Sequence, residues 1–383
     1  MQALSPAKTP NHRPLRKLAL LSDWFLPRQG GIEIQMHDLA HHLTLAGYEV
    51  HVITPIPGPA QMSGFRIHRL HAARMPLFGF VFTPQPFRAI ADLLQRECYE
   101  VVHCHTSYIA PIAFGGTYVS QRLGIPTVIT FHSVLAHFAH VLAASNHWLH
   151  WSDWPVLFSG VSQVVNHALE PLVKPKPVYT LPNAIDIPFW QQAAPSAPSS
   201  REVVLITVTR FSPRKRVAAL LKLVAALRPR LPGVTLKLLI VGDGPLRPAI
   251  AYMVAALGLS AVVTLLGYQP RAKIRESFTR AQIFVTTCAI ESFGLAALEA
   301  RTAGLPVVAR TSGVVQFIRH GQEGLLAHTD AELADQLHTL ITDHQLRKTI
   351  ADHNRTTQPA FGWDSVLPQH LSLYRRAMEI THA

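Results

Sequence analysis

Short apolar runs alternate with amphipathic segments along the chain, and this alternation constrains the fold more than any other feature. Four runs in the first half have the continuous apolar character of strands buried on both faces: KLALLSD (17–23), YEVHVIT (48–54), EVVHCH (100–105) and IPTVITFH (125–132). Between the first two, residues 32–47 carry apolar side chains at helical spacing and end at Gly47, a typical position for a glycine after a helix. The pattern predicts a parallel sheet covered by helices on both faces.

The same alternation begins again after a segment of linker composition, QQAAPSAPSS (191–200). Further strands are expected at EVVLITVTR (202–210), TLKLLIVGDG (235–244), VVTLLGY (262–268), AQIFVTT (281–287) and LPVVAR (305–310). The predicted fold class is therefore α/β, with two doubly wound Rossmann-like domains facing each other across a cleft. We expect the first over residues 1–188 and the second over 189–364, with a C-terminal helix at about 365–383 that packs back on the first domain. Ligands bind outside the carboxyl ends of such strands, so the cleft is the expected site.

Composition limits the class of partner. Of 383 residues, 48% are hydrophobic and 15% charged, which excludes a disordered chain, and the net charge is +12. We expect no nucleic-acid partner, because there is no basic run with interleaved aromatics, no helix-turn-helix signature and no zinc spacing. A nucleoside diphosphate, an anionic membrane or a generally basic surface accounts for the charge. No leader-like or membrane-spanning run is found and the three cysteines show no pairing pattern, so we expect a cytoplasmic protein.

Cations and glycines follow the first strand of each half. Gly30 and Gly31 stand between the first strand and its helix, where the backbone can approach a ligand and offer helix N–H groups to an anion. Arg210 ends the first strand of the second half, and Lys215 follows in the next loop. Both are placed to bind phosphate oxygens, although a glycine pair is often only a turn and surface cations are common.

The segment CAIESFGLAALEA (288–300) holds two carboxylates in apolar surroundings. Ser292 is a competent N-cap, so we expect a helix from Ser292–Phe293, with Gly294 and Leu295 in its first turn. Their N–H groups suit a phosphate. This places Glu291 in the loop facing the cleft. Glu299, inside the helix, can accept hydrogen bonds from a ribose diol or pair with Arg301 or Arg210, and the spacing alone does not decide between these.

Histidines are numerous, at 22, but no carboxylate or cysteine completes a set at ligand spacing, so we expect no metal site. No D-x-D motif is present either. His132 differs from the other histidines because it ends a strand at the expected cleft.

Two aromatic segments are candidates for lipid contact. Residues 74–88 (RMPLFGFVFTPQPFR) carry four phenylalanines between arginines, and residues 147–154 (HWLHWSDW) carry three tryptophans at a spacing of three. Such segments suit a membrane interface or an apolar acceptor pocket, and the alternative is ordinary core.

Taken in order, the motifs resemble the retaining glycosyltransferases of family four, which have the two-domain GT-B fold. The resemblance covers nearly the whole chain and rests on these elements: SDWFLPRQGGIE, VVHCHTS, TVITFHS, LPNAID, VTRFSPRK, VGDGP, VTLLGY, ESFGLAALEA and FGWD…LYRRA. The first half is particularly similar to the N-acetylglucosaminyltransferases that start glycosylphosphatidylinositol anchors and to the phosphatidylinositol mannosyltransferases.

The resemblance implies transfer of a hexose or N-acetylhexosamine from a UDP- or GDP-sugar to a lipid or glycan acceptor, with retention, no metal and no cofactor. It implies a set of roles for residues of this chain. Gly30, Gly31, Arg210 and Lys215 would hold the diphosphate, Glu291 and His132 the transferred sugar, and Glu299 the ribose. Phe293, Gly294, Leu295, Gly267 and Tyr268 would complete the donor site.

Three departures from the family pattern bear on these expectations. Arg216 replaces the glycine usual after the lysine, and Ser312-Gly313-Val314-Val315-Gln316 replaces G-G-x-P-E near the donor. The membrane span of the lipid-anchor enzymes is also absent, so membrane contact would be peripheral. A GT-B sugar-nucleotide epimerase and a non-catalytic sugar-nucleotide or membrane-surface binder are the alternatives.

Overall fold

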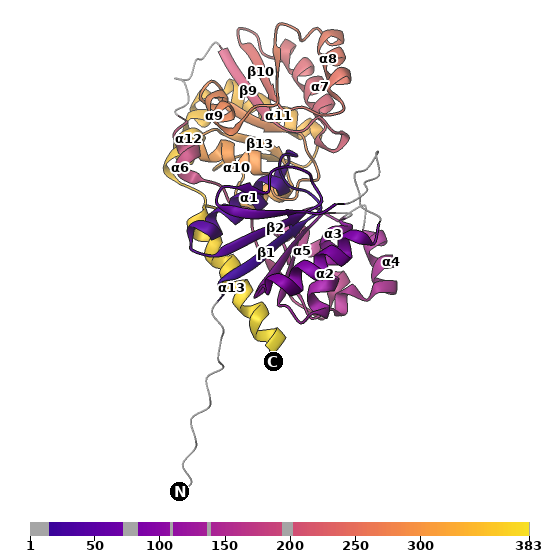
Figure 1. The fold of residues 1–383 in the computed structure, drawn as a ribbon. Helices are drawn as coiled ribbons and strands as arrows, with labels where there is room; N and C mark the ends of the chain where they lie inside the picture. The colour runs from indigo at the N-terminus through magenta and orange to yellow at the C-terminus, as the bar shows by residue number, and fades with distance from the viewer. Residues whose placement is uncertain (1–14, 72–82, 108–109, 136–138, 194–201, 383) are drawn as a thin grey trace.

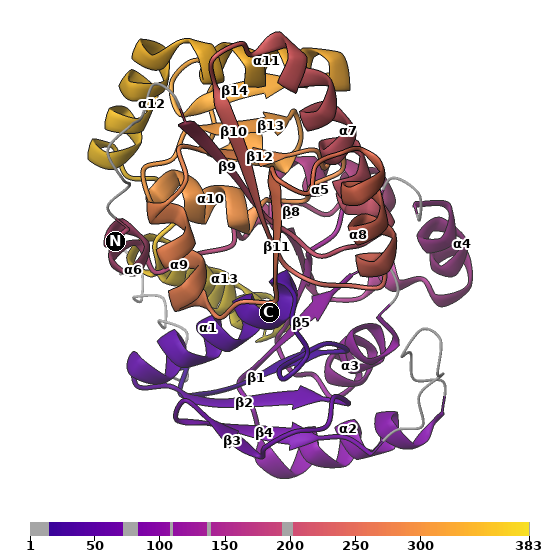
Figure 2. The same ribbon diagram turned by 90° about the horizontal axis from the view of Figure 1, so that it is seen from above.

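A computed structural model describes residues 15–71, 83–107, 110–135, 139–193 and 202–382. Most of the aromatic segment 74–88 lies outside these residues. The chain forms two sheets, each layered between helices, and the two halves lie against each other (Figures 1 and 2). The predicted fold of two Rossmann-like α/β units is confirmed.

The first sheet has eight strands in the order β3-β4-β2-β1-β5-β6-β7-β8, parallel except for β3 against β4. Its strands are β1 (Lys17–Ser22), β2 (Glu49–Thr54), β3 (Gln61–Met62), β4 (Phe65–Arg69), β5 (Val101–Thr106), β6 (Thr127–Phe131), β7 (Leu157–Gly160) and β8 (Val178–Thr180). Its helices are α1 (Gly31–Leu45), α2 (Gln85–Glu97), α3 (Pro111–Arg122), α4 (Ala139–Leu149), α5 (Gln163–Val173) and α6 (Ile187–Gln191).

The second sheet has six parallel strands in the order β11-β10-β9-β12-β13-β14. Its strands are β9 (Glu202–Val208), β10 (Thr235–Val241), β11 (Val263–Gly267), β12 (Ile283–Thr286), β13 (Val307–Arg310) and β14 (Gly324–Ala327). Its helices are α7 (Val217–Leu227), α8 (Arg247–Ala256), α9 (Arg271–Thr279), α10 (Leu295–Thr302), α11 (Asp330–Thr342) and α12 (His344–Thr356).

The strand order reverses at β1 in the first sheet and at β9 in the second, because consecutive strands are added on opposite sides of these two. Ligands of doubly wound sheets bind at such a reversal, beyond the carboxyl ends of the strands. The fold therefore directs attention to the loops after β1 and β9.

The last helix, α13 (Trp363–His382), returns from the second half to the first and packs against α1, β5 and β6 (Figure 1). Alternate residues of the central strands, including Leu18, Leu20, Val101 and Val128, form one core with α1 and α13. The residues between them on the same strands point to the other face of the sheet, where they pack under α2, α3 and α5. No helix within the described residues is long and apolar enough to cross a membrane.

The tryptophans of segment 147–154 do not share one environment. Trp151 is buried against Phe114, Phe131 and Phe158, whereas Trp148 is 80% exposed on α4. Trp151 is therefore an ordinary core residue, as the alternative to lipid contact predicted, whereas Trp148 is not. All three cysteines are free, with Cys98 exposed and the other two buried.

Candidate active site

The loop after β1 meets the start of α10, the helix that follows β12 beside β9. Gly31 is the first residue of α1, and a Cβ on it would lie 3.6 Å from the Cδ1 atom of Leu295, the first residue of α10. A Cβ on Gly30 would lie 2.4 Å from the carboxylate of Glu33. The N-termini of α1 and α10, one from each half, therefore lie against each other, at the junction where the sequence predicts a cleft.

Lys215 and Glu291 form an ion pair just before the N-terminus of α10. Nζ of Lys215 lies 2.5 Å from Oε2 of Glu291, and both side chains are largely buried. Burial by itself raises the pKa of Glu291. The charge and hydrogen bond of Lys215, together with smaller contributions from Arg214 and Cys288, outweigh burial and lower the pKa. Glu291 is therefore held as a carboxylate beside a cation, in the loop between β12 and α10, where the sequence places it.

The helix after this loop begins later than predicted. Ser292 is not its N-cap: α10 begins at Leu295, and Gly294 is the N-cap with a φ of 98°. Ser292 lies in the preceding loop, where its carbonyl oxygen accepts a hydrogen bond from Oγ of Ser162 at 2.5 Å. The positive φ of Gly294 explains the error, because this turn is available to glycine and redirects the chain before the helix starts.

Glu299 is buried among charges from both halves. Burial raises its pKa to about 7, the charge of Arg271 on α9 acts to lower it, and the charge of Asp38 on α1 acts to raise it. Nη2 of Arg271 lies 2.5 Å from Oδ2 of Asp38. The alternative prediction that Glu299 pairs with Arg301 is wrong, because Arg301 forms its ion pair with Glu323, at 3.4 Å.

Arg210 is exposed at the end of β9, and its charge acts on Arg28 and Glu33 in the loop after β1. Arg28 forms an ion pair with Glu33 and lies over the ring of Trp24 at 4.0 Å. The cleft thus holds a second arginine that sequence reasoning missed. Its only signal was a basic residue in the loop before Gly30.

The remaining predicted donor residues differ in what they can reach. Gly267 ends β11 with a φ of 69°, and Tyr268 beside it is exposed. The side chain of Phe293 is buried against Phe317 and Phe361, with ring centroids 5.5 and 5.4 Å away. Only the backbone of Phe293 is therefore available to a ligand.

His132 follows β6 and is almost fully buried, with its Nε2 atom 2.9 Å from Nδ1 of His105. Burial, with a smaller contribution from the charge of His370, lowers the pKa of His132 to about 3. The imidazole is therefore neutral at ordinary pH. His105 is a second residue that sequence reasoning missed, and its only signal was its place in the HCH pattern.

The altered turn at 312–316 keeps close contact with the donor loop. The N–H of Gly313 donates to the carbonyl oxygen of Glu291 at 2.8 Å, and a Cβ on Gly313 would lie 2.4 Å from the Ser292 backbone. A Cβ on Gly294 would lie 2.7 Å from Cγ1 of Val314. Of the two glycines in the family's G-G-x-P-E pattern, this chain keeps only Gly313, and close packing against Ser292 leaves no room for a side chain there.

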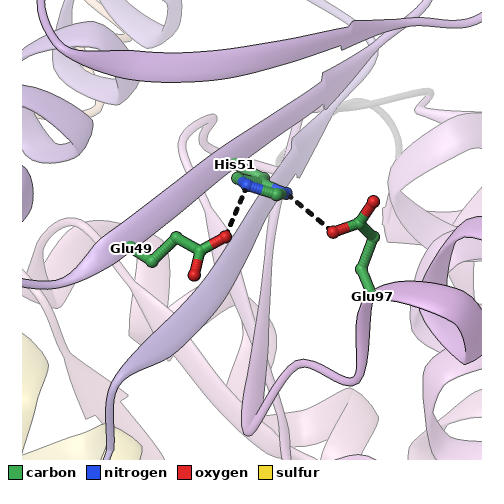
Figure 3. A group of neighbouring side chains, drawn as sticks. All are labelled: Glu49, His51 and Glu97. Atoms are coloured by element: carbon green, nitrogen blue, oxygen red, sulfur yellow. Dashed lines mark ion pairs between the residues drawn. The ribbon is translucent and has the colours of Figure 1, made fainter.

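A group of metal-type ligands lies elsewhere. Among the described residues, Glu49, His51 and Glu97 are close enough to share an ion (Figure 3). The carboxylates approach opposite ring nitrogens, Glu49 at 3.1 Å from Nε2 and Glu97 at 3.9 Å from Nδ1. Nζ of Lys17 already lies 3.0 Å from Glu49 and 2.7 Å from Glu97 and supplies the compensating charge. The group is an ion-pair network near the amino ends of β1 and β2, away from the cleft.

Comparison with known proteins agrees with this geometry. Residues 29–188 match the model of Glycosyltransferase Family 4, and residues 188–357 match that of Glycosyl transferases group 1. A phosphatidylinositol N-acetylglucosaminyltransferase subunit of Arabidopsis thaliana is 25% identical over 96% of this chain and 84% of its own length. The Bacillus anthracis N-acetyl-alpha-D-glucosaminyl L-malate synthase is 27% identical over 91% of this chain and 94% of its own.

Solved structures share the fold. Anabaena HepE in complex with UDP and glucose superposes with a TM-score of 0.74 at 21% identity, over 93% of this chain and 98% of that one. Fold and site together define a glycosyltransferase of the GT-B class. Since the two family models together span residues 29–357, the chain belongs to glycosyltransferase family 4, as the motifs predict.

Proposed function

We propose that this enzyme is a retaining transferase that moves a hexose or N-acetylhexosamine from a UDP- or GDP-sugar to a lipid or glycan acceptor. The observation that supports this most strongly is the Lys215–Glu291 pair just before the N-terminus of α10, the helix whose first residue lies against the start of α1. The names of the relatives agree, since they include a phosphatidylinositol N-acetylglucosaminyltransferase subunit, an N-acetyl-alpha-D-glucosaminyl L-malate synthase and a D-inositol 3-phosphate glycosyltransferase. HepE, which shares the fold, was solved with UDP and glucose.

In this proposal the chain's own cations stabilise the leaving group. Lys215 and Arg210 bind the diphosphate together with the N–H groups that begin α1 and α10. Glu291 accepts hydrogen bonds from hydroxyls of the transferred sugar, and Glu299 accepts them from the ribose. A leaving phosphate oxygen takes the acceptor's proton on the face where the new bond forms. The protein then contributes mainly by stabilising the departing diphosphate and by positioning the acceptor, with no need for a metal or cofactor.

The test begins with a thermal-shift screen of UDP- and GDP-sugars, because a ligand that binds the native state raises the unfolding temperature. Transfer is then followed by NMR, which reports the anomeric configuration of the product. Lys215→Met and Glu291→Gln are expected to lower kcat/KM by about 100-fold or more. Lys222→Met, which changes an exposed lysine on α7, is the matched control and should leave kcat/KM unchanged.

Other outcomes would contradict the proposal in identifiable ways. An inverted product would exclude retention, and wild-type activity in both site variants would exclude the assigned site. A change in the sugar without acceptor would indicate an epimerase. Donor binding without turnover on any acceptor would indicate a binding protein.

We also propose peripheral contact with the anionic inner face of a membrane, through α4. Apart from Leu142, the side chains of α4 are exposed or half-buried, and the exposed ones include Val141, Trp148 and Leu149. An exposed tryptophan suits the interface between lipid and water, and the net charge of +12 favours anionic lipid.

Flotation with liposomes of neutral or anionic lipid tests this contact. We expect more protein to float with anionic liposomes, and Trp148→Ala to reduce the floated fraction several-fold. Tyr252→Ala changes an equally exposed aromatic on α8 and is the control. Equal flotation on both lipids, or equal loss in both variants, would remove the proposal.

A further inference from the structure

A column of buried polar side chains runs along one face of the first sheet and ends at His132. His103 and His105 alternate with Cys104 along β5, and Thr130 precedes His132 at the end of β6. His105 and Thr130 are paired in the strand register, so these side chains share a face. This is the face that α13 covers, and Tyr374 of α13 lies against His103. Each of these side chains is buried, so each N–H group needs an acceptor within the protein.

The hydrogen bonds of His103 have one consistent direction. Oγ of Ser159 donates to the carbonyl oxygen of Ile129, which can only accept. Thr130 therefore donates to Ser159 at 2.6 Å and accepts from Nε2–H of His103 at 2.6 Å. Nδ1 of His103 then accepts from the hydroxyl of Tyr374 at 2.8 Å. All donors in this part of the column are satisfied.

His105 makes a different set of contacts. Its Nδ1 atom lies 2.9 Å from Nε2 of His132, and its Nε2 atom is buried without a hydrogen-bond partner among the described residues. A neutral imidazole carries a single proton. With that proton on Nε2, His105 would bury an N–H group that has no acceptor. With the proton on Nδ1, the Nδ1–H group donates to His132, and Nε2 of His105 is a buried acceptor without a donor. Proteins tolerate a buried acceptor without a partner better than a buried N–H group without one.

We propose that His105 is a positioning residue that fixes the tautomer of His132. Because His105 donates to Nε2 of His132, the single proton of the His132 ring is on Nδ1. His132 follows the carboxyl end of β6 and is 9% exposed, and its Nε2 atom is occupied by His105. Nδ1–H is therefore the donor that the ring has left to offer to a hydroxyl in the cleft. This inference rests on the proposed function for the identity of that hydroxyl, which belongs to the transferred sugar.

Nitrogen NMR of protein labelled with ¹⁵N-histidine tests the tautomer directly, since protonated and bare ring nitrogens have well-separated shifts. The His132→Gln and His105→Asn variants assign the signals by their loss. In the wild-type protein we expect Nδ1 of both residues to be protonated and Nε2 of His132 to be bare. A proton on Nε2 of His132 would overturn the proposal.

Two variants separate hydrogen bonding from packing. His105→Asn places an amide N–H donor near the position of Nδ1, so we expect the His132 spectrum to be retained and kcat/KM to stay within about threefold of wild type. His105→Leu fills the space without a donor and is expected to lower kcat/KM by about tenfold and to move the Nε2 shift of His132. A Leu variant as active as the Asn variant would show that His105 only packs.

The spectrum does not depend on activity. If no nucleotide sugar is turned over, the proposed function fails, while the tautomer assignment is still decided by the wild-type and Asn spectra.

Discussion

Arg216 has a backbone conformation that most residues avoid. Its φ of 54° is in the left-handed region, which glycine adopts most easily, and glycine is the usual residue of the family at this position. Its guanidinium donates to both carboxylate oxygens of Asp330, at 2.9 and 2.5 Å, and to the carbonyl oxygen of Thr287 at 3.2 Å. These bonds tie the loop that carries Lys215 to α11 and to the end of β12. An arginine in place of the family's glycine thus strains the backbone of this turn but adds a hydrogen-bonded cross-link beside the site.

The two contributions can be measured separately. Arg216→Ala removes the cross-link and keeps a side chain in the left-handed region, whereas Arg216→Gly removes the cross-link and relieves the backbone. Because a left-handed conformation costs about 1–2 kcal/mol for an ordinary residue, we expect the Gly variant to be more stable than the Ala variant by about 1 kcal/mol. Urea unfolding of both variants measures this difference. An Ala variant as stable as the Gly variant would show that the backbone at this position is not strained.

The place of a single residue in the fold could be predicted where it directly follows a strand, whereas the roles assigned to these residues stay predictions. Lys215, Glu291 and His132 follow strands, and the rule that ligands bind at carboxyl ends locates them. The pairing of Asp38 with Arg271 had no such signal, because the two residues lie 233 positions apart in the chain and on helices of different halves. Contacts of that kind depend on how the two sheets are docked, which spacing along the chain does not encode.

At the scale of elements, the N-terminus of α10 depends on Gly294. Its φ of 98° directs the chain into the helix, and the neighbouring Val314 leaves no space for a side chain. The backbone N–H groups proposed to bind phosphate follow directly after it. Any change that shifts this turn moves those groups.

We therefore expect Gly294→Ala to weaken nucleotide-sugar binding by about tenfold or more and to destabilise the protein by about 1–2 kcal/mol. Gly258→Ala is the control, because Gly258 also has a positive φ, of 64°, but nothing lies within 4 Å of the position that a Cβ atom would take there. It should lose similar backbone stability and keep its donor affinity. Calorimetric titration and urea unfolding of both variants measure the two effects. Equal loss of affinity in both would contradict a local role for Gly294.

The expected strands were found because long apolar runs identify them, and shorter ones were missed for the same reason. β7 and β14 have four residues each, and β8 has three that are only half-buried. β12 and β13 also have four residues each, but the apolar runs around them, AQIFVTT and LPVVAR, made them recognisable, so strand length alone does not explain the misses. The start of α10 was missed because Ser292 has the features of a cap while the backbone of Gly294 decides the boundary.

At the scale of the whole molecule, the charge state of Glu299 is set by groups from both halves. Burial raises its pKa from 4.5 to about 7, with Arg271 opposing the rise and Asp38 adding to it. Between pH 4.5 and 7 the folded protein therefore holds a proton that the unfolded chain releases. By linkage, the contribution of this group to stability falls as pH rises through that window and is a net cost above it.

Donor binding should show the opposite trend. Ribose hydroxyls donate more strongly to a carboxylate than to a protonated carboxyl, so we expect the Kd for a nucleotide sugar to fall several-fold between about pH 6 and pH 8. Glu299→Gln should remove this dependence, and Asp38→Asn should move its midpoint to lower pH. The Gln control is needed because burial also raises the pKa of Asp23 to about 7. A pH dependence that persists in the Gln variant would assign it to another group.

The return of α13 to the first sheet has a consequence for biosynthesis. His103 and Tyr374, which contact each other in the folded protein, are 271 positions apart. A ribosome adding roughly 5–20 residues per second therefore releases the first sheet about ten seconds or more before the helix that covers it. During that interval the part of the sheet's apolar face over β5 and β6, which α13 covers in the folded protein, is exposed. The nascent chain is thus most prone to aggregation after its first domain has emerged, and it needs its last helix to finish folding what was made first.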